Sequence, residues 1–257
     1  MATALTLPMQ LRGRHGDPQQ RVQKAVDQLL AGEDRPRVLE AGCGSLSRIQ
    51  LPTGRTLVGI DIEQRQLDRN TALDEKILGD LQSFTPPAPG FDLILCWDVI
   101  EHLPEPIKAL ERMTAALNPG GALVLAFPNL WSLKGLVTKF TPYTVHALFY
   151  RFVVGDRRSA DEWDQFPTVF RASIAPGRLR KWAAKHGFQL VYEEVYEGPV
   201  QVGLRSRSRL LDLSFAALGL VSRTLSLGRL DLGLSDCIQV LRLPDGVVND
   251  NDGKAVS

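Results

Sequence analysis

The sequence has few cysteines, no long uncharged apolar run and almost no net charge. Its three cysteines, Cys43, Cys96 and Cys237, form no Cys-x-x-Cys pair, which argues against a disulfide framework or a thiolate zinc site and favours the reducing cytoplasm. No stretch approaches the roughly 20 apolar residues that span a bilayer, and the N-terminus lacks the basic start and apolar run of a signal peptide. The formal net charge of +1 argues against a protein that binds nucleic acid mainly through phosphates.

Short apolar segments alternate with helical patterns along much of the chain. A strand begins at Arg37 and runs into a glycine turn at Gly42, and six more strands are expected over 56–61, 76–80, 91–97, 122–127, 189–196 and 237–243. Helices are expected over 17–32, 63–73, 104–117 and 176–186. This alternation predicts an α/β fold with a Rossmann-like, doubly wound, mostly parallel sheet of seven strands.

The alternation breaks at residues 128–175 and again at 198–235. The first break is irregular and aromatic-rich, and it predicts a cap inserted into one domain that spans 1–257. We expect the cofactor to bind the half over 18–127 and the substrate to bind the two insertions. Four residues of the cap are predicted to contact substrate, although their rings could equally pack the cap onto the sheet: Trp131, Tyr143, His146 and Tyr150.

Acidic residues end the first two expected strands. Glu40 stands two residues before Gly42, and Asp61 stands 19 residues after it, where a carboxylate can accept hydrogen bonds from both ribose hydroxyls. The turn continues Gly44-Ser45-Leu46, so the third glycine of a dinucleotide fingerprint is missing and a nicotinamide dehydrogenase is disfavoured. S-adenosylmethionine (SAM) carries no phosphate, and its ammonium and sulfonium suit these carboxylates.

Five motifs in this order resemble those of class I SAM-dependent methyltransferases. Residues 38–44 resemble motif I, although Leu46 replaces its usual last glycine, and Gly59-Ile60-Asp61 resembles the ribose-binding end of the second strand. Gly79-Asp80-Leu81 resembles the adenine motif, and 117–121 resembles the turn before strand five. Residues 91–103 resemble the strand-four motif of the type-11 group, which includes quinone-biosynthesis methyltransferases. The resemblance covers about half of the chain.

The resemblance implies a set of SAM contacts. Glu40 would order the methionine end, Asp61 would bind the ribose, and Asp80 with Leu81 would frame the adenine. The full set of implied contacts is Glu40, Gly42, Cys43, Gly44, Asp61, Ile62, Asp80, Leu81, Cys96 and Trp97. Taken singly, each carboxylate could instead cap its own loop or form a structural ion pair.

The segment after the fourth expected strand supplies candidates for catalysis. His102 is the first candidate for a general base and Asp98 the second, although His102 could simply organise a helix start. The spacing of Asp98, Glu101 and His102 also resembles a magnesium site of some quinone-pathway methyltransferases. The same residues occur in relatives without a metal, and Mg²⁺ rarely has a dedicated protein cage, so we predict no metal here.

Residues 204–230 alternate apolar residues with five arginines: Arg205, Arg207, Arg209, Arg223 and Arg229. This pattern fits an amphipathic helix on a membrane or over an apolar substrate, but we favour a lid or partner-facing helix with solvated arginines.

The function predicted from these features is methyl transfer from SAM to a small, apolar or aromatic molecule, with oxygen as the favoured acceptor atom. The alternatives are an RNA or protein methyltransferase and a non-catalytic SAM-binding protein. Cys96-Trp97-Asp98-Val99 stands where amino-methylating nucleic-acid enzymes often carry an Asp/Asn-Pro-Pro-aromatic motif, which argues against RNA.

Overall fold

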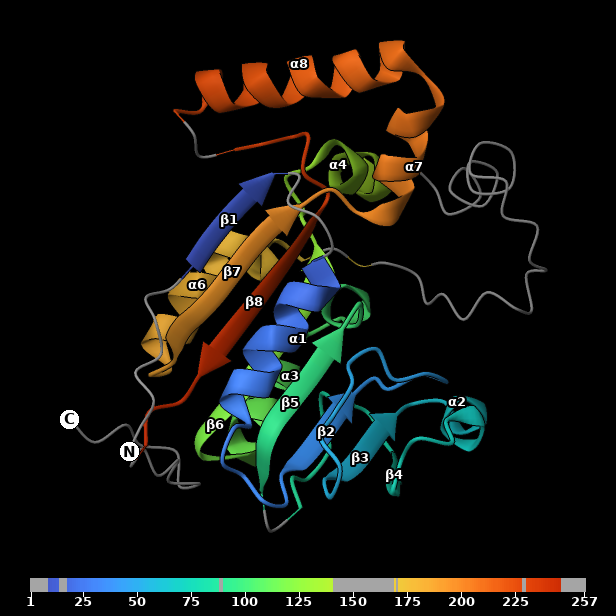
Figure 1. The fold of residues 1–257 in the computed structure, drawn as a ribbon, viewed down its shortest axis with the longest axis vertical. Helices are drawn as coiled ribbons and strands as arrows, with labels where there is room; N and C mark the ends of the chain where they lie inside the picture. The colour runs from blue at the N-terminus through green and yellow to red at the C-terminus, as the bar shows by residue number, and fades with distance from the viewer. Residues whose placement is uncertain are drawn as a thin grey trace.

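The computed structural model describes residues 9–13, 18–87, 90–140, 169, 171–227 and 230–245 (Figure 1). Their strands form one sheet in the order β1-β7-β8-β6-β5-β2-β3-β4. The strands are β1 (Met9–Gly13), β2 (Arg37–Ala41), β3 (Thr56–Asp61), β4 (Glu75–Leu78), β5 (Phe91–Trp97), β6 (Leu117–Pro128), β7 (Gln189–Tyr196) and β8 (Asp236–Arg242). The helices are α1 (Pro18–Leu29), α2 (Gln64–Arg69), α3 (Pro106–Ala116), α4 (Leu133–Phe140), α6 (Pro176–Lys185), α7 (Pro199–Arg207) and α8 (Arg209–Leu225), with short 3-10 turns η1 (Ile100–His102) and η4 (Ala172–Ile174).

The order of the strands creates one place where ligands bind in folds of this kind. From β2 the chain moves outward to β3 and β4, then returns to β5 on the other side of β2 and continues to β6. Only β8 runs antiparallel to its neighbours, β6 and β7. In open α/β sheets the crevice lies outside the carboxyl ends of the strands where the direction of winding reverses, which here is between β2 and β5.

The predicted seven strands are confirmed as β2 to β8, but the sheet has an eighth strand. β1 pairs in parallel with β7 at the edge of the sheet, with Met9 opposite Tyr192 and Gly13 opposite Tyr196. The prediction missed this strand, although Met9, Gln10, Leu11 and Arg12 alternate apolar and polar residues as a strand does. Five residues are a weak local signal, and their pairing with the edge of β7 is a tertiary feature.

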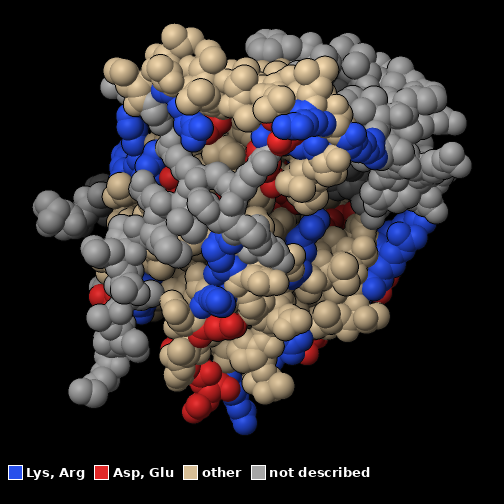
Figure 2. Space-filling view, turned by 45° about the horizontal axis from the view of Figure 1, so that its top comes forward, with Lys and Arg blue, Asp and Glu red and all other residues tan. Residues whose placement is uncertain are grey.

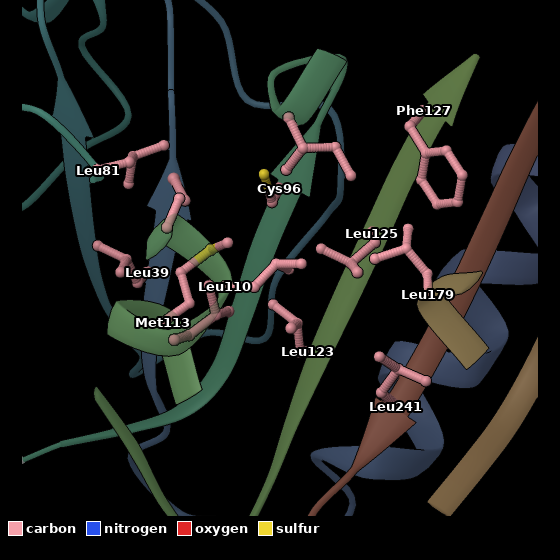
Figure 3. Packing of buried hydrophobic residues seen from close by; sticks show 14 of the residues in the cluster. Leu39, Leu81, Cys96, Leu110, Met113, Leu123, Leu125, Phe127, Leu179 and Leu241 are labelled. Carbon is pink, nitrogen blue, oxygen red and sulfur yellow. The ribbon is translucent and has the colours of Figure 1, made fainter. Parts of the chain in front are cut away.

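Helices cover both faces of the sheet, as continuously apolar strands require. On one face Leu110 and Met113 of α3 and Leu179 of α6 pack against Leu39, Leu123, Leu125 and Leu241 (Figure 3). On the other face Val22 and Val26 of α1 pack against the neighbouring residue of each strand, for example Val38 next to Leu39. Successive residues of a strand are therefore buried in two different hydrophobic cores, one on each face of the sheet.

β7 is fixed to both layers by consecutive carboxylates. Glu193 pairs with Arg180 of α6 at 3.3 Å, and Glu194 pairs with Arg21 of α1, whose Nε donates to Glu194 Oε2 at 3.0 Å. Because successive strand side chains point to opposite faces, two adjacent glutamates anchor one helix on each side of the sheet.

Three predicted boundaries were wrong. The helix expected over 63–73 ends at Arg69, because the side chain of Asn70 accepts from the Ala72 backbone N–H at 3.2 Å and donates to the Gly44 carbonyl at 3.3 Å. The turn expected over 117–121 lies within β6, where the register against β5 shifts between Phe91 and Leu93. The first break of the alternation is not irregular throughout, since residues 133–140 form α4.

The second break, over 198–235, consists mostly of α7 and α8. The prediction that its arginines are all solvated was wrong for Arg205, which is buried and pairs with Glu197 and with Asp212 at 2.9 Å. No helix among the described residues combines the length and apolarity needed to cross a membrane.

Candidate functional site

A cavity opens at the carboxyl ends of β2 and β5, at the predicted switch point. It holds about 330 Å³, including the space open to solvent, and is lined by Glu40, Ala41, Gly42, Cys43, Leu46, Arg48, Ile49, Leu95 and Trp97. The structure therefore brings together Glu40, the glycine turn and Trp97, which the sequence predicted as cofactor contacts. Arg48, which the sequence analysis missed, lies at the same cavity.

The glycine turn needs glycine for two separate reasons. Gly42 and Gly44 have φ values of 70° and 53°, in the left-handed region that other residues rarely adopt. A Cβ on Gly42 would also lie 2.5 Å from Cγ2 of Val99, which follows β5. The turn is fixed to β3, since the backbone N–H groups of Gly42 and Cys43 both donate to the Ile60 carbonyl, at 2.8 and 3.1 Å.

Asp61 lies at the end of β3, and its carboxylate fixes the backbone of two loops, the glycine turn after β2 and the loop that follows β3. Its Oδ2 accepts from the Gly44 N–H at 3.0 Å and its Oδ1 accepts from the Glu63 N–H at 2.9 Å. Each carboxylate oxygen has a second lone pair, so Asp61 can still accept hydrogen bonds from a ligand diol. The neighbouring Ile62 is 60% exposed, so its side chain is accessible to a ligand.

Glu40 is a buried carboxylate at the cavity. Its Oε2 accepts from the Ser47 hydroxyl at 2.6 Å. Burial raises the pKa of Glu40, and the hydrogen bond from Ser47 opposes that shift. A cationic ligand group would restore the charged form of this carboxylate, because an opposite charge nearby favours ionisation.

The other predicted cofactor contacts differ in what their side chains can reach. Burial raises the pKa of Cys43 to about 12, so its thiol at the cavity stays neutral. The side chains of Cys96 and Leu81 lie in the hydrophobic core, so only their backbone groups are available to a ligand. Asp80 accepts from the Gln82 N–H at 2.8 Å, and the Gln82 side chain in turn accepts from the Glu105 N–H at 2.8 Å, which ties this loop to the start of α3.

The segment after β5 is strained and acidic. Asp98 has φ of 55°, and its carboxylate lies 3.6 Å from the guanidinium of Arg48, which lines the cavity. Glu101 is buried, and its Oε1 lies 3.8 Å from Nε2 of His102. Burial first, and then the charge of Asp98, raise the pKa of Glu101 well above its ordinary value. Within the described residues, no three His, Cys, Asp or Glu side chains are grouped as metal ligands.

Further polar residues near Asp98 come from elements that no motif marks. Lys134 of α4 lies 3.2 Å from Asp236, the first residue of β8. Burial raises the pKa of Tyr196, and the carboxylates of Asp236 and Asp98 raise it further. These three residues are distant in sequence, and the sheet topology that joins them could not be seen from spacing alone.

The predicted substrate contacts are mostly outside the described residues. Tyr143, His146 and Tyr150 lie there, as does most of the expected aromatic cap. Trp131 is described: it follows β6, is 41% exposed, and its N–H donates to the Asn129 side chain at 3.1 Å.

Comparison with known proteins decides the family. The profile of the family described as methyltransferase domain matches residues 14–193, which is more than half of the chain. The chain belongs to the methyltransferase domain family. The prediction of a class I SAM-dependent methyltransferase is thereby confirmed, and SAM is the cofactor that goes with this membership.

Individual relatives of this methyltransferase domain protein are distant. The ubiquinone biosynthesis O-methyltransferase of Coxiella burnetii is 28% identical over 163 residues, which cover 60% of this chain and 64% of that protein. A SAM-dependent methyltransferase from Mesorhizobium loti superposes with a TM-score of 0.51 at 14% identity, covering 88% of this chain and 98% of that one. The cyclase SpnF superposes with a TM-score of 0.52 at 16% identity, covering 88% and 82%. These structural matches show the shared fold alone, because one fold carries different reactions.

Proposed function

We propose that this protein transfers the methyl group of SAM to an oxygen atom of a small apolar or aromatic molecule. The observation that carries the proposal is the convergence of Glu40 and the glycine turn at one cavity, with Asp61 bonded to that turn and Asp98 and His102 after the next strand. The Coxiella burnetii relative is named as an O-methyltransferase, which supports oxygen as the acceptor atom.

The residues at the cavity fit SAM by their chemistry. The buried Glu40 carboxylate suits the ammonium of the methionine end. Gly42 and Gly44 present bare backbone to a ligand, and Asp61 has acceptor capacity for two ribose hydroxyls. Trp97 adds an apolar wall at the mouth of the cavity. Asp80 and Ile62, at the ends of β4 and β3, would contact the adenine.

When bound, SAM would supply an electrophilic methyl carbon, which the acceptor oxygen attacks in line while the bond to sulfur breaks and S-adenosylhomocysteine leaves. For such a reaction, positioning and the exclusion of water supply much of the acceleration. We assign positioning of the acceptor to Asp98 and Asp236 at the strand ends and to Lys134 of α4. An oxygen acceptor must also lose a proton, and His102 is our candidate to take it, because it follows β5, whose Leu95 and Trp97 line the cavity.

The acceptor pocket would be completed by Trp131 and by the predicted contacts Tyr143, His146 and Tyr150. We also keep the prediction that one domain spans 1–257, with the cofactor half over 18–127 and substrate insertions over 128–175 and 198–235. A small-molecule acceptor, rather than nucleic acid, is supported by the near-neutral net charge of the chain.

Calorimetric titration with SAM, S-adenosylhomocysteine and NAD tests the cofactor site. Asp61→Ala removes a charged acceptor, and hydrogen bonds to charged groups contribute about 1.5–3 kcal/mol each, so we expect SAM affinity to fall roughly 10- to 150-fold. The matched control is Asp68→Ala, which removes an exposed carboxylate on α2 that accepts a hydrogen bond from Gln64 and should leave affinity unchanged. No SAM binding, or tighter binding of NAD, would refute the proposal.

Turnover with hydroxylated aromatic acceptors then tests the assigned base. His102→Gln should lower kcat while the calorimetric affinity for SAM stays within about twofold, because His102 acts on the acceptor proton and not on the cofactor. Equal loss of both quantities would place His102 in the cofactor pocket wall instead.

A further inference from the structure

α8 is an amphipathic helix whose apolar face points away from the protein. Figure 1 shows it as the outermost helix at one end of the molecule, beyond α7 and α4. Five of its large apolar side chains are between 53% and 81% exposed: Leu210, Leu213, Leu220, Val221 and Leu225. At about 100° per residue they fall within an arc of about 140°, and the sequence places no charged residue inside that arc.

The opposite face of α8 is fixed to the protein, so the outward face is not a consequence of loose packing. Gly219 is buried against Asp231, whose carboxylate also lies 3.4 Å from the guanidinium of Arg223. Ser222 accepts from the Leu232 N–H at 3.1 Å. Near the start of the helix, Asp212 pairs with the buried Arg205 of α7. These contacts hold one defined face outward.

The border of this face is basic. Arg207, Arg209 and Arg223 are exposed; Arg223 also pairs with Asp231, and the one acidic residue of α7 and α8, Asp212, pairs with Arg205. Figure 2 shows an uncharged surface at the top of the molecule, where α8 lies, with blue groups and some red groups along its lower border. A contiguous exposed apolar surface on a folded chain marks an interaction site.

The charge pattern decides which partner fits. A symmetric pair of two copies would place the same patch against itself, so the arginine borders would meet each other without carboxylates between them. An anionic lipid surface offers phosphates to the exposed Arg207 and Arg209 while the leucines enter the boundary between headgroups and acyl chains. We propose that α8 docks this protein in the plane of an anionic membrane surface, through Leu210, Leu213, Leu220, Val221 and Leu225.

This docking would orient the candidate site toward the lipid. The segment that links α8 to β8 contacts the carboxyl end of β6, since the Asn129 N–H donates to the Ser235 carbonyl at 2.8 Å. The Leu133 N–H at the start of α4 donates to the Leu232 carbonyl at 2.9 Å. α8 therefore stands on the same edge of the sheet as the cavity, although the proposal does not depend on the methyl transfer proposed above.

The test is sedimentation of the full chain with vesicles of phosphatidylcholine alone and of equal parts phosphatidylcholine and phosphatidylglycerol. We expect binding to the anionic vesicles and its loss at high salt. Leu220→Glu should lower the partition coefficient at least about tenfold, through the lost apolar burial and the added negative charge. Leu78→Glu is the matched control, because Leu78 on β4 is 58% exposed and Leu220 is 60% exposed. Removing Arg207 and Arg209 together as glutamines should cost about fivefold for each arginine.

Three outcomes would overturn the proposal: no binding to anionic vesicles, equal effects of Leu220→Glu and Leu78→Glu, or self-association in sedimentation equilibrium that Leu220→Glu abolishes while vesicles stay unbound. Circular dichroism and SAM calorimetry on the same variants show that the fold is intact. Vesicle binding without SAM binding would refute the proposed function and leave this inference standing.

Discussion

The contact between the glycine turn and the end of β5 gives a prediction whose size can be worked out from the structure. Gly42→Ala would place a Cβ 2.5 and 2.8 Å from the two γ-methyls of Val99, at a residue whose φ is +70°. A left-handed alanine costs about 1–2 kcal/mol, and forcing a methyl into a packed site costs about 1–3 kcal/mol. Because alanine also restricts the unfolded chain by about 0.4–1 kcal/mol, we expect a net destabilisation of about 3 kcal/mol.

Two further variants separate the steric part from the backbone part. Gly44→Ala has a comparable φ of +53° but no atom within 4 Å of its Cβ, so it should cost only about 1 kcal/mol. Val99→Ala removes both methyls that Gly42→Ala would meet. The double variant Gly42→Ala/Val99→Ala should therefore be more stable than the sum of the two single effects predicts, by about 1–3 kcal/mol.

Urea unfolding followed by circular dichroism measures this cycle, and SAM calorimetry measures its effect on the cofactor site. A destabilisation of about 3 kcal/mol also corresponds to a fall in Tm of roughly 6–12 °C for a chain of this size. SAM affinity should fall with Gly42→Ala and recover in part in the double variant. Strict additivity, or an equal cost for Gly44→Ala, would refute the steric argument.

Two other predictions concern buried charges. Burial raises the pKa of Glu101, so the wild type loses stability as pH rises from the unfolded-state pKa of this group towards its folded-state pKa. Glu101→Gln should therefore gain stability relative to wild type between pH 4.5 and pH 8. Urea unfolding at both pH values measures this gain, and a smaller stability difference at pH 8 would contradict the prediction. Arg205→Ala removes the cation that pairs with the buried side chain of Glu197 and should lower the free energy of unfolding by about 3–5 kcal/mol. The control, Arg209→Ala, changes an exposed arginine and should change the free energy of unfolding by less than about 0.5 kcal/mol. Equal effects of the two variants would refute the structural role of the pair.

The cofactor half was predictable because its information is local. Strand β2, the turn after it and Asp61 occupy consecutive positions whose geometry follows from short-range rules: a buried strand, a left-handed glycine and an acidic residue at the next strand end. The hydrogen bond from Gly44 to Asp61 shows that even the bland reading of Asp61, as a residue that fixes a loop, was partly right. The same carboxylate shapes the turn and, in the proposed function, would also accept hydrogen bonds from the ribose.

The polar cluster of Lys134, Tyr196 and Asp236 was not predictable, because its residues meet only through the topology. Lys134, Tyr196 and Asp236 come from three elements separated by up to about 100 positions, and their proximity depends on β8 inserting antiparallel between β6 and β7. The same insertion sets the position of α8. A helix placed between β7 and β8 must leave the sheet at its carboxyl edge and return there, so α8 lies at the same edge of the sheet as the cavity. The topology fixes the place of α8, and the sequence decides which side chains its exposed face carries. The exposed leucines on that face belong to no cofactor-binding motif. We infer that the sequence of the proposed cofactor half is constrained by a ligand of fixed shape, whereas the sequence of the α7–α8 segment is constrained by a surface. Substitutions in α8 can therefore change membrane binding without changing which ligand binds in the cavity.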